Sequence, residues 1–214
     1  MTGKTGSGSF LSDNEYRHLP CYQEHIKTLF DYSASILSLV LLSPLILMLI
    51  ILIRISGKGP LIYSQDRIGK EGKPFMIYKF RSMVHDAEYH EPMLSHNKEE
   101  RVTAVGRLMR KYRLDEIPNF INVLKGEMSV VGPRPERQYF IEKMICGAPE
   151  CLLLQKVKPG ITSYGQVRFG YASTVEEMLK RLEFDLFYMK HRSLLFDLKI
   201  LLLTLRVVLS GKGV

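Results

Sequence analysis

An uncharged apolar run over residues 32–53 constrains the fold of this 214-residue chain more than any other feature. As a helix rising about 1.5 Å per residue, it would be about 33 Å long, enough to cross the hydrocarbon core of a bilayer. The run starts too far into the chain and is too long for a signal peptide, and no small-residue cleavage site precedes Arg54. A domain of this size could not surround such a helix, so we expect the segment to attach the chain to a membrane.

Ser43 and Pro44 interrupt the run near its middle. Pro44 has no backbone N–H and its ring clashes with the preceding turn, whereas Ser43 can bond to a carbonyl that the proline leaves free. A bend is therefore tolerable in lipid, and a bent helix can enter and leave a membrane by the same face. Basic residues flank both ends, so charge bias alone leaves a spanning and a re-entrant helix open.

The remaining sequence divides into three segments around this run. Residues 1–12 are rich in glycine and serine, and we expect a disordered tail there. Residues 13–57 contain the N-terminal helix and the membrane helix, which ends at the glycines and proline of 57–60. Residues 58–214 form one domain, because the chain is too short for two full domains and a membrane element.

Two strand-like runs open this domain, at residues 61–65 and 74–80, and the turn-rich segment between them predicts a β-hairpin. Most other segments are helical in pattern, so the predicted fold class is α+β and mostly helical. The polar residues 85–100 indicate a surface loop with some helix. The other predicted elements are helices at 118–125, near 137–146 and at 175–190, a strand at 128–131 and a turn at 159–162.

The last predicted helix, residues 194–209, is very apolar but carries three charged side chains. Asp197 and Thr204 share one face, and Lys199 and Arg206 lie nearly opposite. These charges argue against a second membrane span. We expect a helix that packs between the domain and the membrane surface, as part of a set of membrane-associated C-terminal helices.

The formal net charge is +8 and the pI is about 9.3, so anionic partners are favoured: a phospholipid surface, a nucleic acid or a phosphorylated substrate. The basic residues are not interleaved with exposed aromatic residues, and a nucleic-acid partner would leave the apolar run unexplained, so we expect no nucleic acid. The three cysteines have no paired spacing, which is typical of reduced thiols in a cytosolic domain.

Asp115 and Glu116 are adjacent carboxylates at the start of a predicted helix, directly after a segment rich in arginine. A helix N-terminus and nearby cations favour negative charge, so both should be ionised. Adjacent side chains diverge, and one could act as a nucleophile while the other binds Mg²⁺. Acidic residues are also common helix caps, and on spacing alone capping is the simpler interpretation.

Arg134 lies between Pro133 and Pro135, which stiffen the backbone and fix the direction of the side chain. A rigid arginine after a strand suits bidentate binding of a phosphate. Lys79 lies near the end of the second strand-like run and Arg81 directly follows it, and both could simply form a solvated strand face. None of these features is specific by itself.

Taken in order along the chain, the motifs resemble the bacterial sugar transferases, the small monotopic phosphoglycosyl transferases that act on polyprenyl phosphate. The resemblance covers about residues 25–214, and the ordered set is highly specific although each motif alone is weak. The motifs are Gln65-Asp-Arg-Ile-Gly69, Tyr78-Lys-Phe-Arg-Ser-Met83, Arg107-x-x-Arg110, Leu114-Asp-Glu-Ile-Pro118, Asn122-Val-Leu-Lys-Gly126, Gly132-Pro-Arg-Pro135 and Pro159-Gly-Ile-Thr162.

The resemblance implies a reaction and a place in the cell. A sugar 1-phosphate would pass from a UDP-sugar to polyprenyl (undecaprenyl) phosphate, giving polyprenyl-diphosphate-sugar and UMP, as the first membrane step of bacterial glycan biosynthesis. Residues 58–214 would be the catalytic domain, on the cytoplasmic face of the inner membrane of a bacterium. The break at Ser43 and Pro44 would make the membrane helix re-entrant.

The resemblance also implies roles for single residues. Asp115 matches the aspartate that attacks the β-phosphate and forms a covalent phosphosugar intermediate, and Glu116 matches its Mg²⁺-binding neighbour. Arg110 and Arg134 match arginines that hold phosphate groups. Lys79 and Arg81 are further residues that we expect to bind the substrate phosphates. Asp185 matches an acid of the family, although a plain helix-face acid is an equal alternative.

Residues 163–171 depart from the commoner family pattern, so no sugar specificity carries over. The sequence also leaves open the pathway, the polyprenol length and whether the chain forms a homodimer. A second class of function is a non-catalytic membrane-bound scaffold that binds anionic lipid. That alternative gives no reason for a paired carboxylate among ordered arginines.

Overall fold

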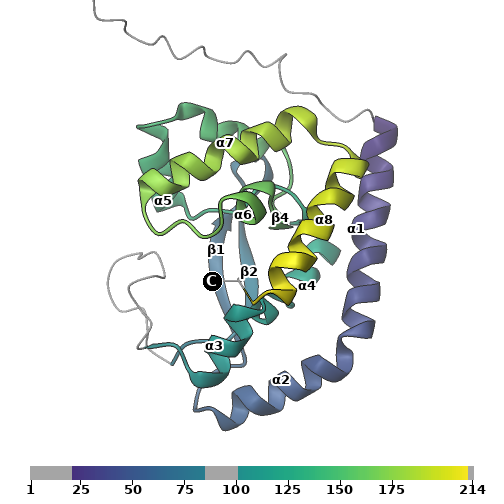
Figure 1. The fold of residues 1–214 in the computed structure, drawn as a ribbon, viewed down its shortest axis with the longest axis vertical. Coiled ribbons are helices and arrows are strands. Elements are labelled where there is room, and N and C mark those ends of the chain that lie inside the picture. Colours follow the sequence, from purple (N-terminus) through teal and green to yellow (C-terminus); the bar gives the residue numbers. More distant parts are fainter. Residues whose placement is uncertain (1–20, 85–100, 212–214) are drawn as a thin grey trace, which may run out of the picture.

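The computed structural model describes residues 21–84 and 101–211. The predicted tail at 1–12, the start of the N-terminal helix and the loop at 85–100 lie outside these residues. The described chain is a mostly helical α+β fold with one antiparallel hairpin, which confirms the predicted fold class at this level (Figure 1). The helices are α1 (Cys21–Leu41), α2 (Ser43–Ile55), α3 (Ala104–Lys111), α4 (Asn119–Leu124), α5 (Gln138–Ile145), α6 (Tyr164–Arg168), α7 (Val175–His191) and α8 (Leu194–Leu209); the strands are β1 (Ile62–Ile68), β2 (Pro74–Phe80), β3 (Ser129–Val131) and β4 (Gly160–Thr162); and the 3₁₀ turns are η2 (Lys70–Gly72), η4 (Leu114–Glu116) and η5 (Pro149–Lys156).

The apolar run is bent where the sequence predicts it. The chain bends by 62° between α1 and α2, a bend that Figure 1 shows. The hydroxyl of Ser43 donates to the carbonyl oxygen of Val40 at 2.7 Å. That carbonyl is the one that an N–H at position 44 would bond in an unbroken helix, so Ser43 satisfies the acceptor that Pro44 leaves free. Within the described residues, no single helix has the length and apolar character of a membrane span, whereas α1 from Gln23 onward and α2 meet that test together as a bent pair.

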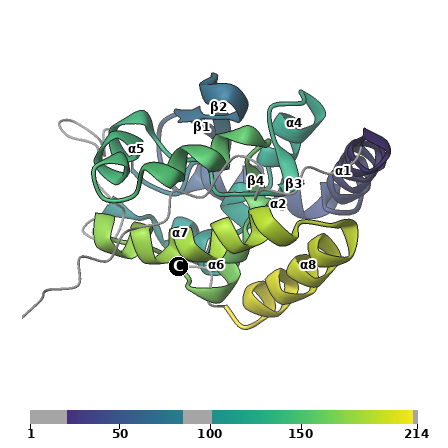
Figure 2. The ribbon, with the colours of Figure 1, turned by 90° about the horizontal axis from the view of Figure 1, so that it is seen from above.

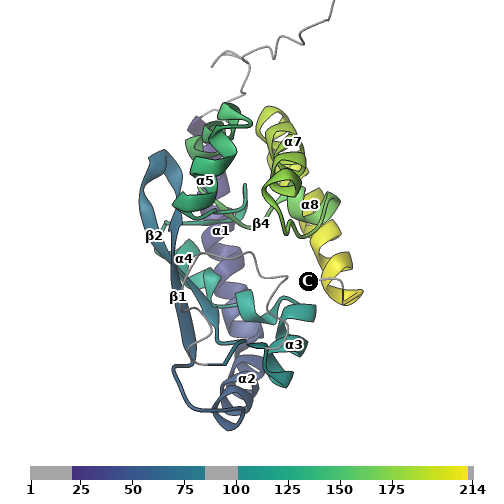
Figure 3. The ribbon, with the colours of Figure 1, turned by 90° about the vertical axis from the view of Figure 1, so that its left-hand side faces the viewer.

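The strands form two small sheets. β1 and β2 pair antiparallel, with Tyr63 opposite Lys79, which confirms the predicted hairpin; β1 continues to Ile68, three residues beyond the predicted end. β3 and β4 pair parallel, with Ser129 opposite Gly160. Figures 2 and 3 show the hairpin on one side of the β3–β4 pair and helices α7 and α8 on the other.

The prediction of a turn at 159–162 was wrong, because Gly160–Thr162 is strand β4. Pro159 and Gly160 have the composition of a turn, but here Gly160 allows two backbone segments to lie in close contact. A Cβ on Gly160 would lie 2.1 Å from the nitrogen of Gly132, and a Cβ on Gly132 would lie 2.6 Å from the carbonyl oxygen of Lys158. Only glycine lets the two segments approach this closely.

Helix α2 packs directly against the segments that surround the acidic pair. Leu49 and Ile53 are fully buried, and they share a hydrophobic cluster with Phe80 of β2, Met109 of α3 and Ile117. Ile117 immediately follows the acidic pair in the sequence. The position of the helix pair and the position of the carboxylates are therefore set by one continuous core.

Helix α1 is fastened to the domain by a buried ionic network. Lys27 bonds Asp31 at 2.8 Å and Asp197 of α8 at 3.0 Å. Asp31 also accepts from the backbone N–H of Val130 in β3 at 3.2 Å, and Asp197 accepts from the hydroxyl of Tyr188 at 2.9 Å. The carboxylate of Asp197, whose charge argues against a second span, thus faces the domain and joins α8 to α1 through its ion pair with Lys27.

Helix α8 has two different faces. Asp197 and Ile200 are buried against the domain, and the hydroxyl of Thr204 bonds that of Thr162 at 2.8 Å. The other face exposes a row of leucines at three- and four-residue spacing, which is a continuous apolar stripe. The leucines of this stripe are Leu195, Leu198, Leu202, Leu205 and Leu209.

Candidate active site

Asp115 and Glu116 lie in η4, a single 3₁₀ turn between α3 and α4. Arg113, just before it, has a left-handed backbone with φ of 53°, which turns the chain sharply after α3. Both carboxylates are buried, each with a relative exposure of 8%. The N-cap position of α4 is occupied by Pro118, so neither carboxylate caps that helix and the capping interpretation does not account for the pair.

Two cationic side chains from other parts of the fold contact the carboxylate of Glu116. The Nζ atom of Lys79 in β2 lies 2.6 Å from Glu116 Oε1, and Nη1 of Arg134 lies 3.6 Å from the same oxygen. The close contact between Gly132 and Gly160 fixes the backbone just before Arg134, and Pro133 accepts from the N–H of Gly160 at 2.8 Å. The structure therefore brings together Glu116, Lys79 and Arg134, three of the predicted site residues.

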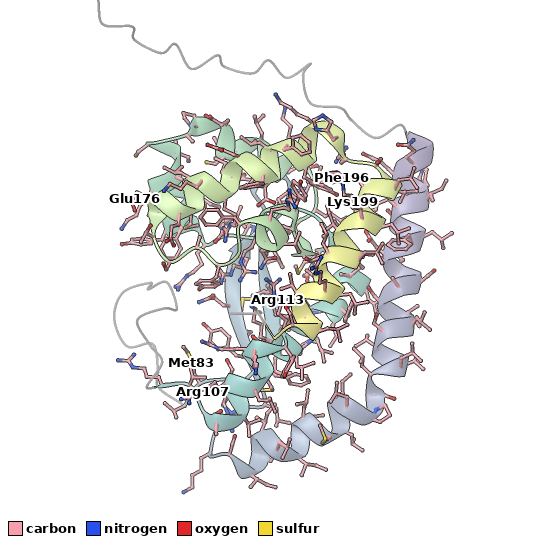
Figure 4. All side chains as sticks on the ribbon, viewed as in Figure 1. Met83, Arg107, Arg113, Glu176, Phe196 and Lys199 are labelled. Atoms are coloured by element: carbon pink, nitrogen blue, oxygen red, sulfur yellow. The ribbon has the colours of Figure 1, made fainter. Side chains whose placement is uncertain are left out.

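Arg110 approaches the pair from α3. Its Nε donates to the hydroxyl of Ser82 at 2.9 Å, and its charge is near enough to Asp115 to favour the ionised carboxylate. Helix α3 can press onto this segment because its residue 106 is glycine: a Cβ on Gly106 would lie 1.9 Å from the carbonyl oxygen of Ser82. Arg113 belongs to the same group of cations, and Figure 4 shows it at the centre of the molecule, between the hairpin and α8.

Arg81 is turned away from the acidic pair. Its side chain is 7% exposed, and Nη2 donates to the carbonyl oxygens of Ile53 at 2.8 Å and Gly57 at 2.7 Å. These carbonyls belong to the end of α2 and the turn after it, where carbonyl groups lack helical partners. The structure thus places Arg81 as a cap of α2 rather than beside Asp115.

The environment shifts the two carboxylates in opposite directions. Burial raises the pKa of Glu116, but Lys79, Arg134 and Arg113 outweigh it and bring the pKa to about 2. Burial also raises the pKa of Asp115, and there Lys79 and Arg110 do not fully compensate, while the charge of Glu116 raises it further. We expected both carboxylates to be ionised; Glu116 fits that expectation, and Asp115 is shifted toward its neutral form.

A small pocket opens beside Glu116, and two of its polar residues were not predicted to belong to the site: Asn119, and Arg67, which was noted only as part of the motif from Gln65 to Gly69. Arg67 donates to Gln65 at 2.7 Å and lies 4.0 Å from Glu136, but its Nε has no partner in the described chain. Asn119 is 2% exposed, and its Oδ1 likewise has no donor there. The pocket is lined by Arg67, Ile77, Lys79, Glu116, Asn119, Met128, Arg134, Pro135, Gly160 and Ile161.

Asp185 does not line this pocket. It is 2% exposed on α7 and accepts from the N–H of Gly165 in α6 at 2.9 Å. Burial raises its pKa to about 6, although Arg181 and the Gly165 N–H act in the opposite direction. Its contacts join α6 to α7, and Arg181 continues the chain of charges to Glu136.

The donor set of the pocket fits Mg²⁺. No group of three or more acidic, histidine or cysteine side chains that could hold a metal occurs in residues 21–84 and 101–211. Mg²⁺ does not need such a group, because it commonly binds one or two carboxylates together with waters and substrate phosphates. Glu116 and the unpartnered amide oxygen of Asn119 are oxygen donors of the required kind.

Residues 22–211 match the family described as bacterial sugar transferase. A UDP-N-acetylgalactosamine-undecaprenyl-phosphate N-acetylgalactosaminephosphotransferase of Aeromonas hydrophila is 40% identical over 88% of this chain and 44% of its own length. A UDP-glucose:undecaprenyl-phosphate glucose-1-phosphate transferase of Klebsiella pneumoniae is 42% identical over 83% of this chain and 39% of its own length.

The chain thus spans less than half the length of these two relatives. It is also similar to a sugar transferase of Bacillus subtilis, with 39% identity over 88% of this chain and 90% of that protein.

Proposed function

Because the chain belongs to the bacterial sugar transferase family, we propose that it transfers a sugar 1-phosphate from a UDP-sugar to polyprenyl phosphate and releases UMP. The observation that carries this proposal is a buried carboxylate pair surrounded by cations from β2, α3 and the turn after β3. Both substrates carry phosphates, which such a set of cations can hold and orient.

We assign the nucleophile to Asp115. One carboxylate oxygen attacks the β-phosphorus of the UDP-sugar, the bond from that phosphorus to the bridging oxygen breaks, and UMP leaves with the electron pair. In the second displacement an oxygen of the lipid phosphate attacks the same phosphorus, and the Asp115 carboxylate is released. Splitting the transfer in this way means that the lipid need not be present while UMP departs.

Glu116 would bind Mg²⁺, and the cationic side chains around it would stabilise the charge on the transferred phosphoryl group. Lys79 and Arg134 are already beside the carboxylate of Glu116, so they are held in place before a substrate binds. Cations fixed in advance stabilise the charge that develops on the transferred phosphoryl group without having to reorganise. A bound Mg²⁺, held by Glu116, would neutralise the diphosphate and favour the departure of UMP.

We further propose that α1 and α2 form a re-entrant membrane element of a bacterial inner membrane, with the catalytic residues on the cytoplasmic face. Exposed apolar side chains along both helices and the leucine stripe of α8 support this placement. The shared core of α2 and Ile117 would then hold Asp115 at a fixed height relative to the lipid headgroups.

The alternative of a lipid-binding scaffold is not favoured by any of these contacts. Anionic lipid would be bound by exposed cations, whereas Lys79 and Arg134 converge on a buried carboxylate. A scaffold would also gain nothing from burying Asp115 and Glu116 side by side, since that burial costs free energy.

The proposal is tested by UMP release from a panel of UDP-sugars, with the chain in detergent or nanodiscs and with polyprenyl phosphate and Mg²⁺ supplied. At least one UDP-sugar should give UMP, and Asp115→Asn should reduce the release to background. Asp66→Asn removes an exposed carboxylate of β1 and should keep full activity. Undiminished turnover in Asp115→Asn would exclude the assigned mechanism.

A further inference from the structure

Asn119 is the buried amide whose hydrogen bonding is incomplete at the edge of the pocket. It begins α4, three residues after Glu116, and both residues line the same pocket. The side chain is 2% exposed, and Oδ1 receives no hydrogen bond within the described residues. Leaving a buried acceptor unpaired costs about 1–3 kcal/mol, so an unpaired acceptor that lines a pocket calls for an explanation.

A second asparagine on the same helix shows what a structural amide looks like here. Asn122 donates to the carbonyl oxygen of Met76 and to Glu127, both at 2.7 Å, and it accepts from the N–H of Tyr78 at 3.2 Å. Its amide is fully used in fixing α4 to β2. Asn119 has no comparable role for its oxygen, although it is as deeply buried.

The chemistry of the unpaired atoms indicates what fills the pocket. An amide oxygen is only an acceptor, so it repels phosphate oxygens and requires a cation or a donor group. Nε of Arg67, which lines the same pocket, is also unpaired in the described chain, and it can donate to an acceptor such as a phosphate oxygen. An unpaired donor and an unpaired acceptor in one pocket complement a divalent cation carried with a diphosphate.

We propose that Asn119 Oδ1 joins Glu116 as a ligand of the divalent cation in this pocket. The inference deepens the proposed function, on which it rests for the identity of the phosphate substrate. The spacing supports it, because residues three apart in a helical turn point to the same side. The amide oxygen is neutral, so it adds a metal ligand without adding to the repulsion between Asp115 and Glu116.

The test is a titration of the full chain, stripped with EDTA and held in nanodiscs, with Mn²⁺ followed by electron paramagnetic resonance in the presence of UDP. Asn119→Leu keeps the approximate shape and removes the oxygen, and it should weaken Mn²⁺ binding by about 10-fold or more. Asn119→Asp restores an oxygen donor and should bind Mn²⁺ at least as tightly as the wild type.

A matched control comes from α6. Gln166 is another buried amide, 6% exposed, whose Oε1 is also unpaired in the described chain, but it does not line the pocket. Gln166→Met should bind Mn²⁺ as the wild type does.

The stability of Asn119→Leu gives a second measurement. In EDTA this variant should be no less stable than the wild type, because it replaces an unsatisfied buried polar group. When Mn²⁺ and UDP are added, its stability should increase less than that of the wild type.

Three results would overturn the inference: wild-type Mn²⁺ affinity in Asn119→Leu, equal weakening in Asn119→Leu and Gln166→Met, or no Mn²⁺ binding by the wild-type chain. Failure of the proposed function looks different. In that case the wild type binds Mn²⁺ in an Asn119-dependent way, yet it releases no UMP from any UDP-sugar.

Discussion

At the scale of single residues, the acidic pair shows how two neighbouring carboxylates acquire different properties. Glu116 contacts Lys79 at 2.6 Å, which together with Arg134 and Arg113 lowers its pKa to about 2 in spite of burial. Asp115 is equally buried and its pKa is raised. A carboxylate that is desolvated and less fully paired is better suited to attack phosphorus than one held tightly by cations.

The contact between Lys79 and Glu116 gives a direct test of this division. Lys79→Met removes the cation while keeping the length of the side chain, and we expect kcat/KM for the UDP-sugar to fall by about 100-fold, as for the loss of one group that stabilises a transition state. Lys73→Met, which breaks an exposed ion pair with Glu71 on the same hairpin, should have little effect. Equal activities of the two variants would show that the transfer does not need the Lys79 cation.

Asp185 gives a prediction about stability and pH. Burial raises its folded-state pKa to about 6, whereas the unfolded value is about 4. Between these values the folded chain keeps a proton that the unfolded chain has lost, so Asp185 lowers the stability as the pH rises from about 4 to about 6. The shift corresponds to a change on the order of 3 kcal/mol.

The measurement is chemical denaturation of the wild type and Asp185→Asn at several pH values. The stability difference between the two proteins should change across that window and stay constant above it. Glu183→Gln, an exposed change on the same helix, should show no such trend. Parallel pH curves for the wild type and Asp185→Asn would contradict the raised pKa.

At the scale of elements, Arg81 connects the end of the bent helix pair α1–α2 to the strand that carries Lys79 of the candidate site. Its guanidinium holds the carbonyls of Ile53 and Gly57, while its neighbours in the sequence reach the site: Lys79 contacts Glu116, and Ser82 accepts from Arg110. A shift at the end of α2 would therefore move both contacts together.

Arg81→Met should loosen this connection without removing a substrate contact. We expect faster hydrogen exchange in the last turn of α2 and a lower kcat, with little change in KM for the UDP-sugar. Arg54→Met, an exposed change in the same turn, serves as the control. A large increase in KM with unchanged exchange would support a phosphate contact instead.

The sequence was informative for elements whose signal is local. The hairpin, the bend at Ser43 and Pro44 and the helices near 118–125 and 175–190 follow from alternation, proline chemistry and helical periodicity. Strand β4 was missed because Pro159 and Gly160 have the composition of a turn, and its parallel partner lies about thirty residues earlier in the chain. No local pattern shows that a glycine is needed for contact with a distant backbone.

The candidate site was predictable only in part for the same reason. Asp115, Glu116 and Arg134 stand out through their neighbours in the sequence and the resemblance to a family. Asn119 and Arg67 matter because burial leaves an oxygen and a nitrogen unpaired, and unpaired atoms have no signature in sequence. Nor could the sequence show that Arg81 turns toward the end of α2.

At the scale of the whole molecule, the helix pair and the domain form one body. Asp31 of α1 accepts from the N–H of Val130, two residues before the turn that carries Arg134, and Lys27 joins α1 to Asp197 of α8. These buried contacts and the shared core of α2 fix the site relative to the apolar surfaces of α1, α2 and α8. If these surfaces lie in a membrane, as we propose, they set the distance from Asp115 to the proposed lipid substrate.

The proposed re-entrant arrangement predicts that both ends of the bent pair face the cytoplasm. In a chain whose native cysteines are replaced by serine, Ser12→Cys and Ser210→Cys should both resist a membrane-impermeant thiol reagent added from the periplasmic side. Both should react after the membrane is opened. Labelling of Ser12→Cys alone from the periplasm would show that the segment spans the membrane.

The proposed mechanism requires that Asp115 becomes covalently attached to a sugar phosphate, and intact-protein mass spectrometry can detect this attachment. With a UDP-sugar that supports turnover, and without polyprenyl phosphate, the wild-type chain should gain the mass of one sugar phosphate, which peptide mapping should assign to Asp115. Addition of polyprenyl phosphate should remove that mass, and Asp115→Asn should never acquire it. Transfer to the lipid without any adduct, or an adduct that persists in Asp115→Asn, would contradict the account.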